Sequence, residues 1–231
     1  MKTVGIIGGL GPESTVEYYR LILQGHRQRN PTGRAASILL NSVDMNTVLD
    51  LAAAGAREKL AAYLLAELEK LARAGADFGV IAANTPHLVF DEVQRQSPIP
   101  LISIVEATCA AAQSLGLKRV GLFGTRFTMQ APFYSEVFSR AGVGIMLPKE
   151  IEQEYIHHKY LTELVRGDIQ PETREQLVNL VAGLKERLQI QGLVLGGTEL
   201  SLIFTEPEVC GIPVLDTTRI HVAAIVERLQ S

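Results

Sequence analysis

The chain has 231 residues, of which 47% are hydrophobic and 20% are charged, and its formal net charge is -3. This length and apolar content allow a substantial buried core, in one large domain or two small ones. Acidic and basic residues are interspersed, so we expect neither nucleic acid nor an anionic membrane surface as a partner. No apolar run approaches the roughly 18 residues of a membrane span, and we expect a cytoplasmic protein. Cys109 and Cys210 form no CxxC or metal-ligand spacing, so we expect two free thiols.

Short apolar runs alternate along the chain with longer segments of helical periodicity. The runs lack polar alternation, which is typical of parallel strands covered on both faces. We expect strands near residues 3–8, 36–42, 78–83, 100–103, 119–124, 143–146, 192–196 and 213–216. Between them, segments such as 54–74 and 171–189 carry apolar residues at helical spacing. This alternation predicts an α/β fold.

An internal duplication is the most informative feature of the sequence. MKTVGIIGG at 1–9 aligns with LKRVGLFGT at 117–125, and FGVIAANT at 78–85 aligns with GLVLGGTE at 192–199. PIPLIS at 98–103 likewise matches GIPVLD at 211–216. Similar strand composition does not explain the shared glycines and Ile-Pro pairs. The duplication predicts two similar lobes, 1–98 plus 209–231 and 99–208, each a mostly parallel sheet flanked by helices and related by a pseudo-two-fold axis.

The duplication also predicts where a ligand binds. Open parallel sheets bind ligands beyond the carboxyl ends of their strands. If the lobes face each other, the strand ends after Gly8, Ala83, Gly124 and Gly197 converge on one cleft. A small molecule there would meet equivalent groups from opposite sides, which suits stereochemical inversion at one carbon.

Five motifs resemble those of the aspartate/glutamate racemase family, and the resemblance spans essentially the whole chain. They are GIIGGLGPEST at 5–15, ANTPH at 83–87, GTRFTM at 124–129, GGTEL at 196–200 and IPVLDTTRIH at 212–221. The resemblance implies an amino-acid racemase that needs no cofactor, PLP included, and that forms a homodimer. Its expected partner is an amino acid or a small dicarboxylate. In that family the two loops usually read Cys-Asn-Thr-x-His and Gly-Cys-Thr-Glu, and one cysteine removes the α-proton while the other returns one.

Both cysteine positions are substituted in this chain, by Ala83 and Gly197. Neither residue can carry a proton, and losing one positioned general base commonly costs about 10²- to 10⁴-fold in rate. We therefore expect a retained binding frame with impaired α-proton exchange. Cys109 and Cys210 are expected to be structural. Three explanations stay open: a variant from which cysteines were removed, a paralogue that binds without reacting, and an enzyme such as a lyase or decarboxylase that uses other groups.

Short polar residues follow several strands close to predicted helix starts. These residues are Asn84, Thr85, Thr125, Thr128 and Thr198. Helix capping is the alternative role for each of them, and capping is compatible with anion binding because a helix start also presents free N–H groups. The resemblance implies that Asn84, Thr85, Thr125 and Thr198 contact the substrate's α-amino and α-carboxylate groups. Glu199 is expected to orient a neighbouring group or the substrate ammonium, or else to be an exposed first-turn glutamate.

The turn GGLGPEST at 8–15 lacks the third glycine of a dinucleotide fingerprint. Its backbone N–H groups, Gly9 included, are expected either to accept a carboxylate or to form only a tight turn before a helix. Arg166 matches a cationic position that the family uses for a distal carboxylate, with Arg126 and Lys159 in reserve. Val48 stands where some aspartate-specific members carry arginine, so a preference for aspartate does not follow.

The histidines indicate structural roles rather than a metal site. No HExxH motif or paired Cys/His spacing occurs, and His157 and His158 are adjacent and so point apart on a helix. His87 and His221 close two of the family-like motifs, and we expect packing or capping from both. The sequence therefore predicts neither a metal nor another cofactor.

Overall fold

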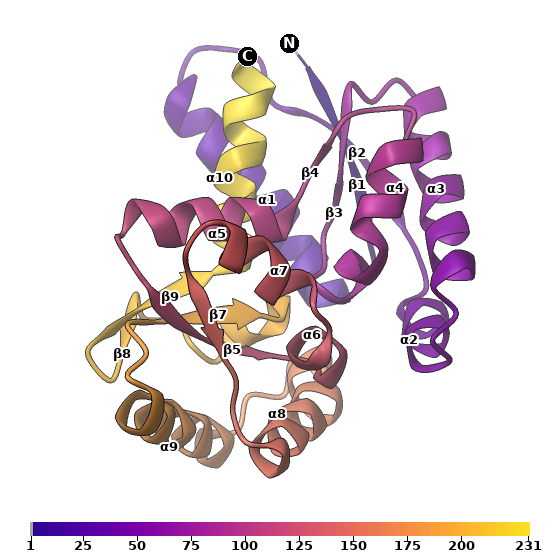
Figure 1. Cartoon of the computed structure of the whole chain (residues 1–231). Coiled ribbons are helices and arrows are strands. Elements are labelled where there is room, and N and C mark those ends of the chain that lie inside the picture. The colour runs from indigo at the N-terminus through magenta and orange to yellow at the C-terminus, as the bar shows by residue number, and fades with distance from the viewer. Residues whose placement is uncertain (1) are drawn as a thin grey trace. The chain divides into compact units, whose positions relative to one another are not determined.

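The expected apolar runs form the strands of two sheets, drawn in Figure 1 from a computed structural model that describes residues 2–231. The chain divides into two units. Unit 1 runs to Ile104 and includes the C-terminal residues Thr218–Ser231, and unit 2 comprises Val105–Thr217. The duplication in the sequence predicts boundaries at 98/99 and 208/209. The unit boundaries fall later because the strand at 101–102 pairs within the first sheet and the strand at 212–216 pairs within the second.

The sheet of unit 1 contains four parallel strands. They are β1 (Thr3–Gly8), β2 (Ser37–Ser42), β3 (Phe78–Ile81) and β4 (Leu101–Ile102), in the order β2-β1-β3-β4. The central pair aligns Gly5 with Gly79. A Cβ on Gly5 would lie 2.9 Å from Ala76 Cβ and one on Gly79 would lie 3.0 Å from Leu68 Cδ2, so both glycines let helices and loops approach the sheet closely.

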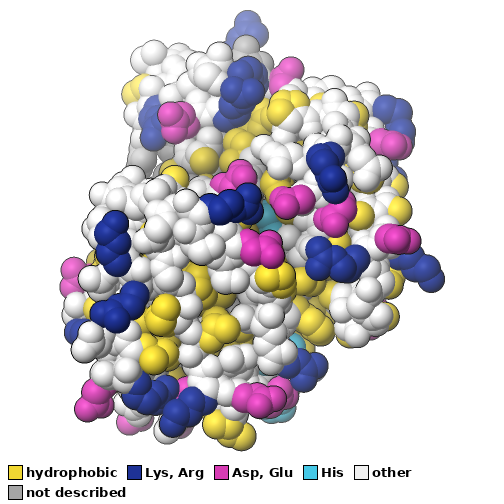
Figure 2. Space-filling view, viewed as in Figure 1, with side chains coloured by type: hydrophobic (Ala, Val, Ile, Leu, Met, Phe, Trp, Pro, Cys, Tyr) yellow, Lys and Arg dark blue, Asp and Glu magenta, His cyan; other side chains and the backbone are white. Residues whose placement is uncertain are grey.

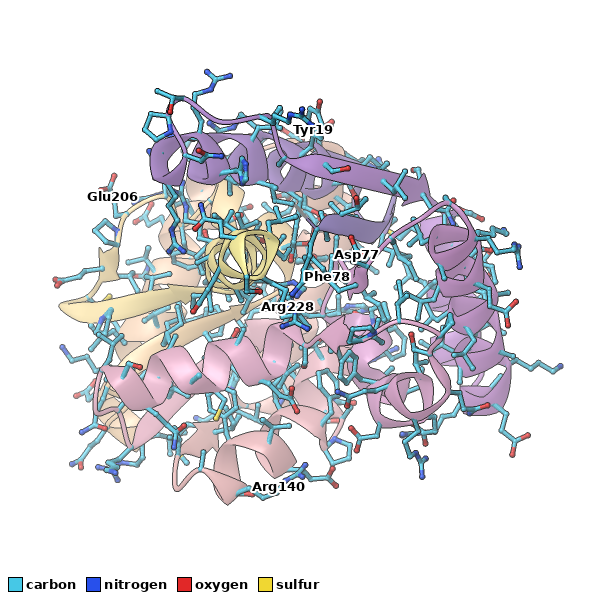
Figure 3. All side chains as sticks on the ribbon, turned by 90° about the horizontal axis from the view of Figure 1, so that it is seen from above. Tyr19, Asp77, Phe78, Arg140, Glu206 and Arg228 are labelled. Carbon is cyan, nitrogen blue, oxygen red and sulfur yellow. The ribbon has the colours of Figure 1, made fainter. Side chains whose placement is uncertain are left out.

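Helices cover both faces of this sheet (Figure 1). On one face lie α1 (Pro12–Arg29) and α10 (Thr217–Gln230), and on the other lie α2 (Met45–Ala53), α3 (Arg57–Arg73) and α4 (Phe90–Gln96). Figure 3 shows Phe78 on the side of the sheet that faces α10, where it packs with Ile22 and Ile225. The continuous apolar runs of the strands follow from this two-sided burial.

The sheet of unit 2 contains five strands. They are β5 (Arg119–Gly124), β6 (Gly144–Met146), β7 (Gly192–Gly196), β8 (Glu208–Val209) and β9 (Ile212–Asp216), in the order β6-β5-β7-β9-β8. All pairs are parallel except β8 with β9. We did not predict β8, because a two-residue edge strand has no periodicity of its own. The helices of this part of the chain are α5 (Ile104–Ser114), α6 (Arg126–Gln130), α7 (Phe133–Arg140), α8 (Glu150–Thr162) and α9 (Pro171–Leu188).

The two sheets share one strand order, which confirms the duplication predicted from the sequence. Strands β2-β1-β3-β4 of unit 1 correspond in order to β6-β5-β7-β9 of unit 2. The matched segments at 1–9 and 117–125 contain β1 and β5, and those at 78–85 and 192–199 contain β3 and β7. The predicted α/β class with helix-flanked parallel sheets is also confirmed.

The surface in Figure 2 carries acidic and basic side chains interspersed with one another, without an extended area of one sign. This agrees with the charge pattern of the sequence. Among residues 2–231, no helix has the length and apolar content needed to cross a membrane.

Candidate functional site

Apart from the candidate cations, the candidate site residues lie at or just after the carboxyl ends of the central strands of each sheet. We call residues 82–87, which follow β3, the first tip, and residues 196–200, at the end of β7, the second tip. A short 3₁₀ helix begins within each tip, η1 (Thr85–Val89) in the first and η3 (Thr198–Leu202) in the second. The duplicated segments therefore place equivalent loops at equivalent strand ends of the two units.

The first tip has no ionisable side chain at position 83. Ala83 is buried and packs into the core between the sheet and helices α2 to α4. Asn84 and Thr85, which follow it, are buried as well. The Asn84 side chain makes no cap hydrogen bond to η1, so the alternative role of helix capping is wrong for Asn84. Its carbonyl oxygen accepts from the His87 N–H at 2.9 Å.

His87 holds the backbone of the first tip. Its Nδ1 lies 3.0 Å from the Ala83 carbonyl oxygen, and the Ile104 N–H lies 3.4 Å from its Nε2. These contacts assign the proton to Nδ1, because Nε2 accepts from an N–H group. Burial, and secondarily the charge of His221, lowers the pKa of His87 from 6.5 to about 3. The imidazole is therefore a neutral structural group, as the sequence predicted.

The second tip places a buried carboxylate beside a glycine. Gly197 has an extended backbone with φ of −149° and precedes the first turn of η3. The Thr198 hydroxyl donates to Glu199 Oε2 at 3.0 Å, and the Tyr160 hydroxyl of α8 donates to the same oxygen. Glu199 is only 1% exposed. The expectation of an exposed first-turn glutamate is wrong, because the carboxylate turns inward to accept these two hydroxyls. That Glu199 orients a neighbouring group stays a prediction.

Sequence reasoning did not single out Tyr160, yet its ring lies where a side chain at residue 197 would begin. A Cβ atom added to Gly197 would lie 3.0 Å from Tyr160 Cζ and 3.1 Å from its hydroxyl oxygen, and closer still to Cε2. Tyr160 is 6% exposed. No motif connects positions 160 and 197, so only the packing of α8 against the end of β7 reveals the pair.

Two threonines flank the second tip from the neighbouring strand end. Thr125 caps α6, because its hydroxyl accepts from the Thr128 N–H at 3.2 Å, which confirms its capping role. The Thr128 methyl would lie 3.1 Å from a Cβ placed on Gly196, so Thr128 packs against the second tip. Thr125, Thr128 and Thr198 are therefore gathered at adjacent strand ends of unit 2.

The turn after β1 is closed by its own hydrogen bonds. The Gly9 N–H donates to Thr15 Oγ1 at 2.9 Å, and the Thr15 hydroxyl in turn donates to the Gly11 carbonyl at 2.9 Å. Gly9 has φ of +79°, which favours glycine. In this conformation the Gly9 N–H is already engaged, so the alternative expectation of a tight turn describes the loop.

Arg166 is the candidate cation whose charge is not paired. It is exposed at the end of η2 (Leu164–Arg166), and within residues 2–231 no carboxylate lies within ion-pair distance of it. Element η2 contacts η3, so Arg166 is carried next to the second tip. By contrast, Arg126 pairs with Glu154 at 3.4 Å and Lys159 pairs with Glu163.

The two cysteines are free thiols, as predicted. Cys109 is buried in α5 with Sγ 3.9 Å from the Val137 carbonyl oxygen, and burial together with the charge of Glu106 raises its pKa. Cys210 is partly buried, with Sγ 3.7 Å from the Val178 carbonyl oxygen. Among the residues that the structure describes, no three His, Cys, Asp or Glu side chains cluster in a way that could hold a metal ion.

Comparisons with known proteins agree with the fold. The sequence model of the family described as Asp/Glu/hydantoin racemase matches residues 7–225. A candidate Asp/Glu racemase from Yersinia pestis and an aspartate racemase homologue from Pyrococcus horikoshii OT3 superpose with TM-scores of 0.89 and 0.85. Each is 32% identical with full coverage of both chains. A broad-specificity amino-acid racemase of Bacillus subtilis (strain 168) is 26% identical over 155 residues, covering 64% of this chain and 63% of that protein.

Proposed function

Because the chain belongs to the Asp/Glu/hydantoin racemase family, we propose that it binds an amino acid or a small dicarboxylate but exchanges the α-proton far more slowly than thiol-bearing members do. One observation carries this proposal: residues 83 and 197, the positions in the two tips where the family carries its cysteines, are an alanine and a glycine. We therefore propose that this chain keeps the residues that bind the substrate and lacks the two groups that exchange the proton.

The polar groups that would bind the substrate support the first half of the proposal. Asn84 and Thr85 are buried at the first tip, and Thr125 and Thr198 are buried at adjacent strand ends of unit 2. Buried polar groups that follow parallel strands are typical of sites that orient small anions. Arg166 supplies an exposed positive charge beside η3, which suits the distal carboxylate of an acidic amino acid.

The chemistry of racemisation supports the second half. Inverting the α-carbon requires a base that removes the proton from one face and an acid that supplies a proton to the other. A methyl group and a hydrogen atom can do neither. Cys109 and Cys210 contact the carbonyl groups of Val137 and Val178, so neither thiol is placed to take over. The loss of two positioned groups is expected to remove most of the rate.

Three further properties belong to the proposal. The reaction class needs no PLP, because the family exchanges the α-proton directly. We place the protein in the cytoplasm, where two free thiols are stable. The resemblance also favours a homodimer, which sedimentation equilibrium tests directly.

Proton exchange and binding, measured on the same samples, test the proposed function. Aspartate, glutamate and neutral amino acids of both hands are incubated with the protein in D₂O, and loss of the α-proton signal is followed by NMR. Isothermal titration calorimetry measures binding of the same compounds. We expect binding to at least one of them and exchange at least about 10²-fold slower than with a thiol-bearing family member. Exchange at that member's rate, or no binding to any compound, would contradict the proposal.

A cysteine-free variant is the matched control. Cys109→Ser combined with Cys210→Ala removes both thiols without touching either tip. Any residual exchange by the unaltered chain is expected to persist in this variant. Loss of the residual exchange would show that one of these thiols carries the chemistry.

A further inference from the structure

We propose that Tyr160 closes the second tip, by occupying both the space of a side chain at residue 197 and the polar groups that would hold a substrate carboxylate. Tyr160 is thereby the residue that determines which substrate groups this tip accepts and which side chain residue 197 can carry. The inference rests on the proposed function, because closure matters only if the tip binds a ligand.

The steric part follows from the position of the tyrosine ring. Atoms of Tyr160 lie 3.0 and 3.1 Å from the place of a Cβ at residue 197, and Cε2 lies nearer still. Ordinary van der Waals contact between carbon atoms begins near 3.5 Å. Even a methyl group at residue 197 therefore requires the ring to move. The ring is buried, so moving it means breaking the contacts that hold it.

The polar part follows from the groups around the tyrosine hydroxyl. The hydroxyl donates to Glu199, and it lies within hydrogen-bonding reach of the Thr198 hydroxyl and the Glu199 backbone N–H. Burial, followed by the negative charge of Glu199, raises the pKa of Tyr160 well above its usual value. The phenol therefore stays protonated and keeps donating to the carboxylate. The Thr198 hydroxyl and the Glu199 N–H, which start η3, are engaged by the chain itself.

The closure has a consequence for affinity. A ligand that needs the Glu199 N–H and the space beside Gly197 binds only molecules in which Tyr160 has moved away. If that open state is a small fraction of the population, the apparent affinity falls by the same fraction. In such two-state equilibria the minor state commonly makes up less than about a tenth of the molecules. If the open state is this rare, removing the ring is expected to tighten binding of a carboxylate by about tenfold or more.

The closure also changes how thiol chemistry would be restored. Ala83→Cys with Gly197→Cys leaves the new side chain at residue 197 against the tyrosine ring. Adding Tyr160→Ala opens the space for it. We therefore expect the triple variant to racemise an amino acid at least about tenfold faster than the double variant, because a displaced reacting group commonly costs that much or more.

A double-mutant cycle between positions 160 and 197 tests the steric part without any ligand. Gly197→Ala is expected to lower the folded-to-unfolded ratio about tenfold or more in the presence of Tyr160, and less than about threefold when combined with Tyr160→Ala. Tyr155→Ala, on the same helix and only partly buried, is the matched control and should not couple to Gly197→Ala. Tyr160→Leu replaces Tyr160→Ala if the latter does not fold.

Calorimetry with aspartate, glutamate and succinate completes the test. Coupling in the cycle together with tighter binding by Tyr160→Ala supports the inference. Additive effects of Gly197→Ala and Tyr160→Ala, or binding that Tyr160→Ala leaves unchanged, overturn it. If Gly197→Ala and Tyr160→Ala are coupled but no variant binds any probe, Tyr160 still fills the side-chain space at residue 197. That result overturns the proposed function instead.

Discussion

Lowering the pH is expected to destabilise unit 1 through two buried neutral histidines. His221 donates from Nε2 to the Ile102 carbonyl at 3.0 Å and accepts the Tyr18 hydroxyl at Nδ1, 2.8 Å away. Burial lowers its pKa from 6.5 to about 4, and burial with the nearby charge of His221 lowers that of His87 to about 3. Both rings are therefore neutral in the folded chain at pH 5, where they are protonated in the unfolded chain.

The sign and size of the effect follow from proton linkage. Because the unfolded chain binds more protons, the free energy of unfolding falls as the pH drops below about 6.5. The fall from these groups continues to about pH 4 for His221 and about pH 3 for His87. Between pH 7 and pH 5 each histidine contributes a loss of about 2 kcal/mol, at 1.36 kcal/mol per pH unit below the unfolded pKa. Together they remove roughly 4 kcal/mol from a total that is typically about 5–15 kcal/mol.

Urea unfolding at pH 7 and pH 5 measures this loss. The chain has no tryptophan, so far-UV circular dichroism is the suitable probe. His87→Gln and His221→Gln are each expected to reduce the difference between the two pH values by about 2 kcal/mol. His158→Gln, which alters an exposed histidine of α8, is the matched control. An equal pH dependence in all four proteins would refute the assignment of His87 and His221 as neutral buried groups.

Three further predictions concern the stability of unit 1, each measured by urea unfolding at pH 7. Gly9→Ala is expected to cost about 2–4 kcal/mol, because φ is +79° and the new Cβ would lie 2.6 Å from Ser42 Oγ. Gly55→Ala, which also has positive φ but open space around it, should cost only about 1 kcal/mol, and equal losses at the two glycines would contradict the clash. Tyr18→Phe leaves His221 Nδ1 buried without its donor and should cost about 1–3 kcal/mol, whereas a neutral effect would argue against this hydrogen bond. Leu68→Ala opens a cavity in the core beside β1 and β3 and should cost about 2–5 kcal/mol, and a loss below about 1 kcal/mol would show that the core collapses around it.

The strands could be predicted from local pattern alone. The apolar runs coincide with eight strands to within two residues at each end, because strands buried on both faces must be apolar throughout. The duplication was visible for a similar reason, since matching glycines and Ile-Pro pairs mark equivalent strand starts and ends. Strand β8 was not visible, because two residues become a strand only through their pairing with Ile212 and Pro213.

Some features of the two tips can be predicted from the sequence, and others are determined only by the tertiary structure. The sequence alone shows that Ala83 and Gly197 carry no ionisable group and that threonines follow the strand ends. The inward turn of Glu199, the engaged N–H of Gly9 and the ring of Tyr160 over Gly197 are not visible in the sequence. Each depends on contacts between atoms that the chain brings together only after the helices pack on the sheet, and no local periodicity records which side chain will fill the space that a glycine leaves.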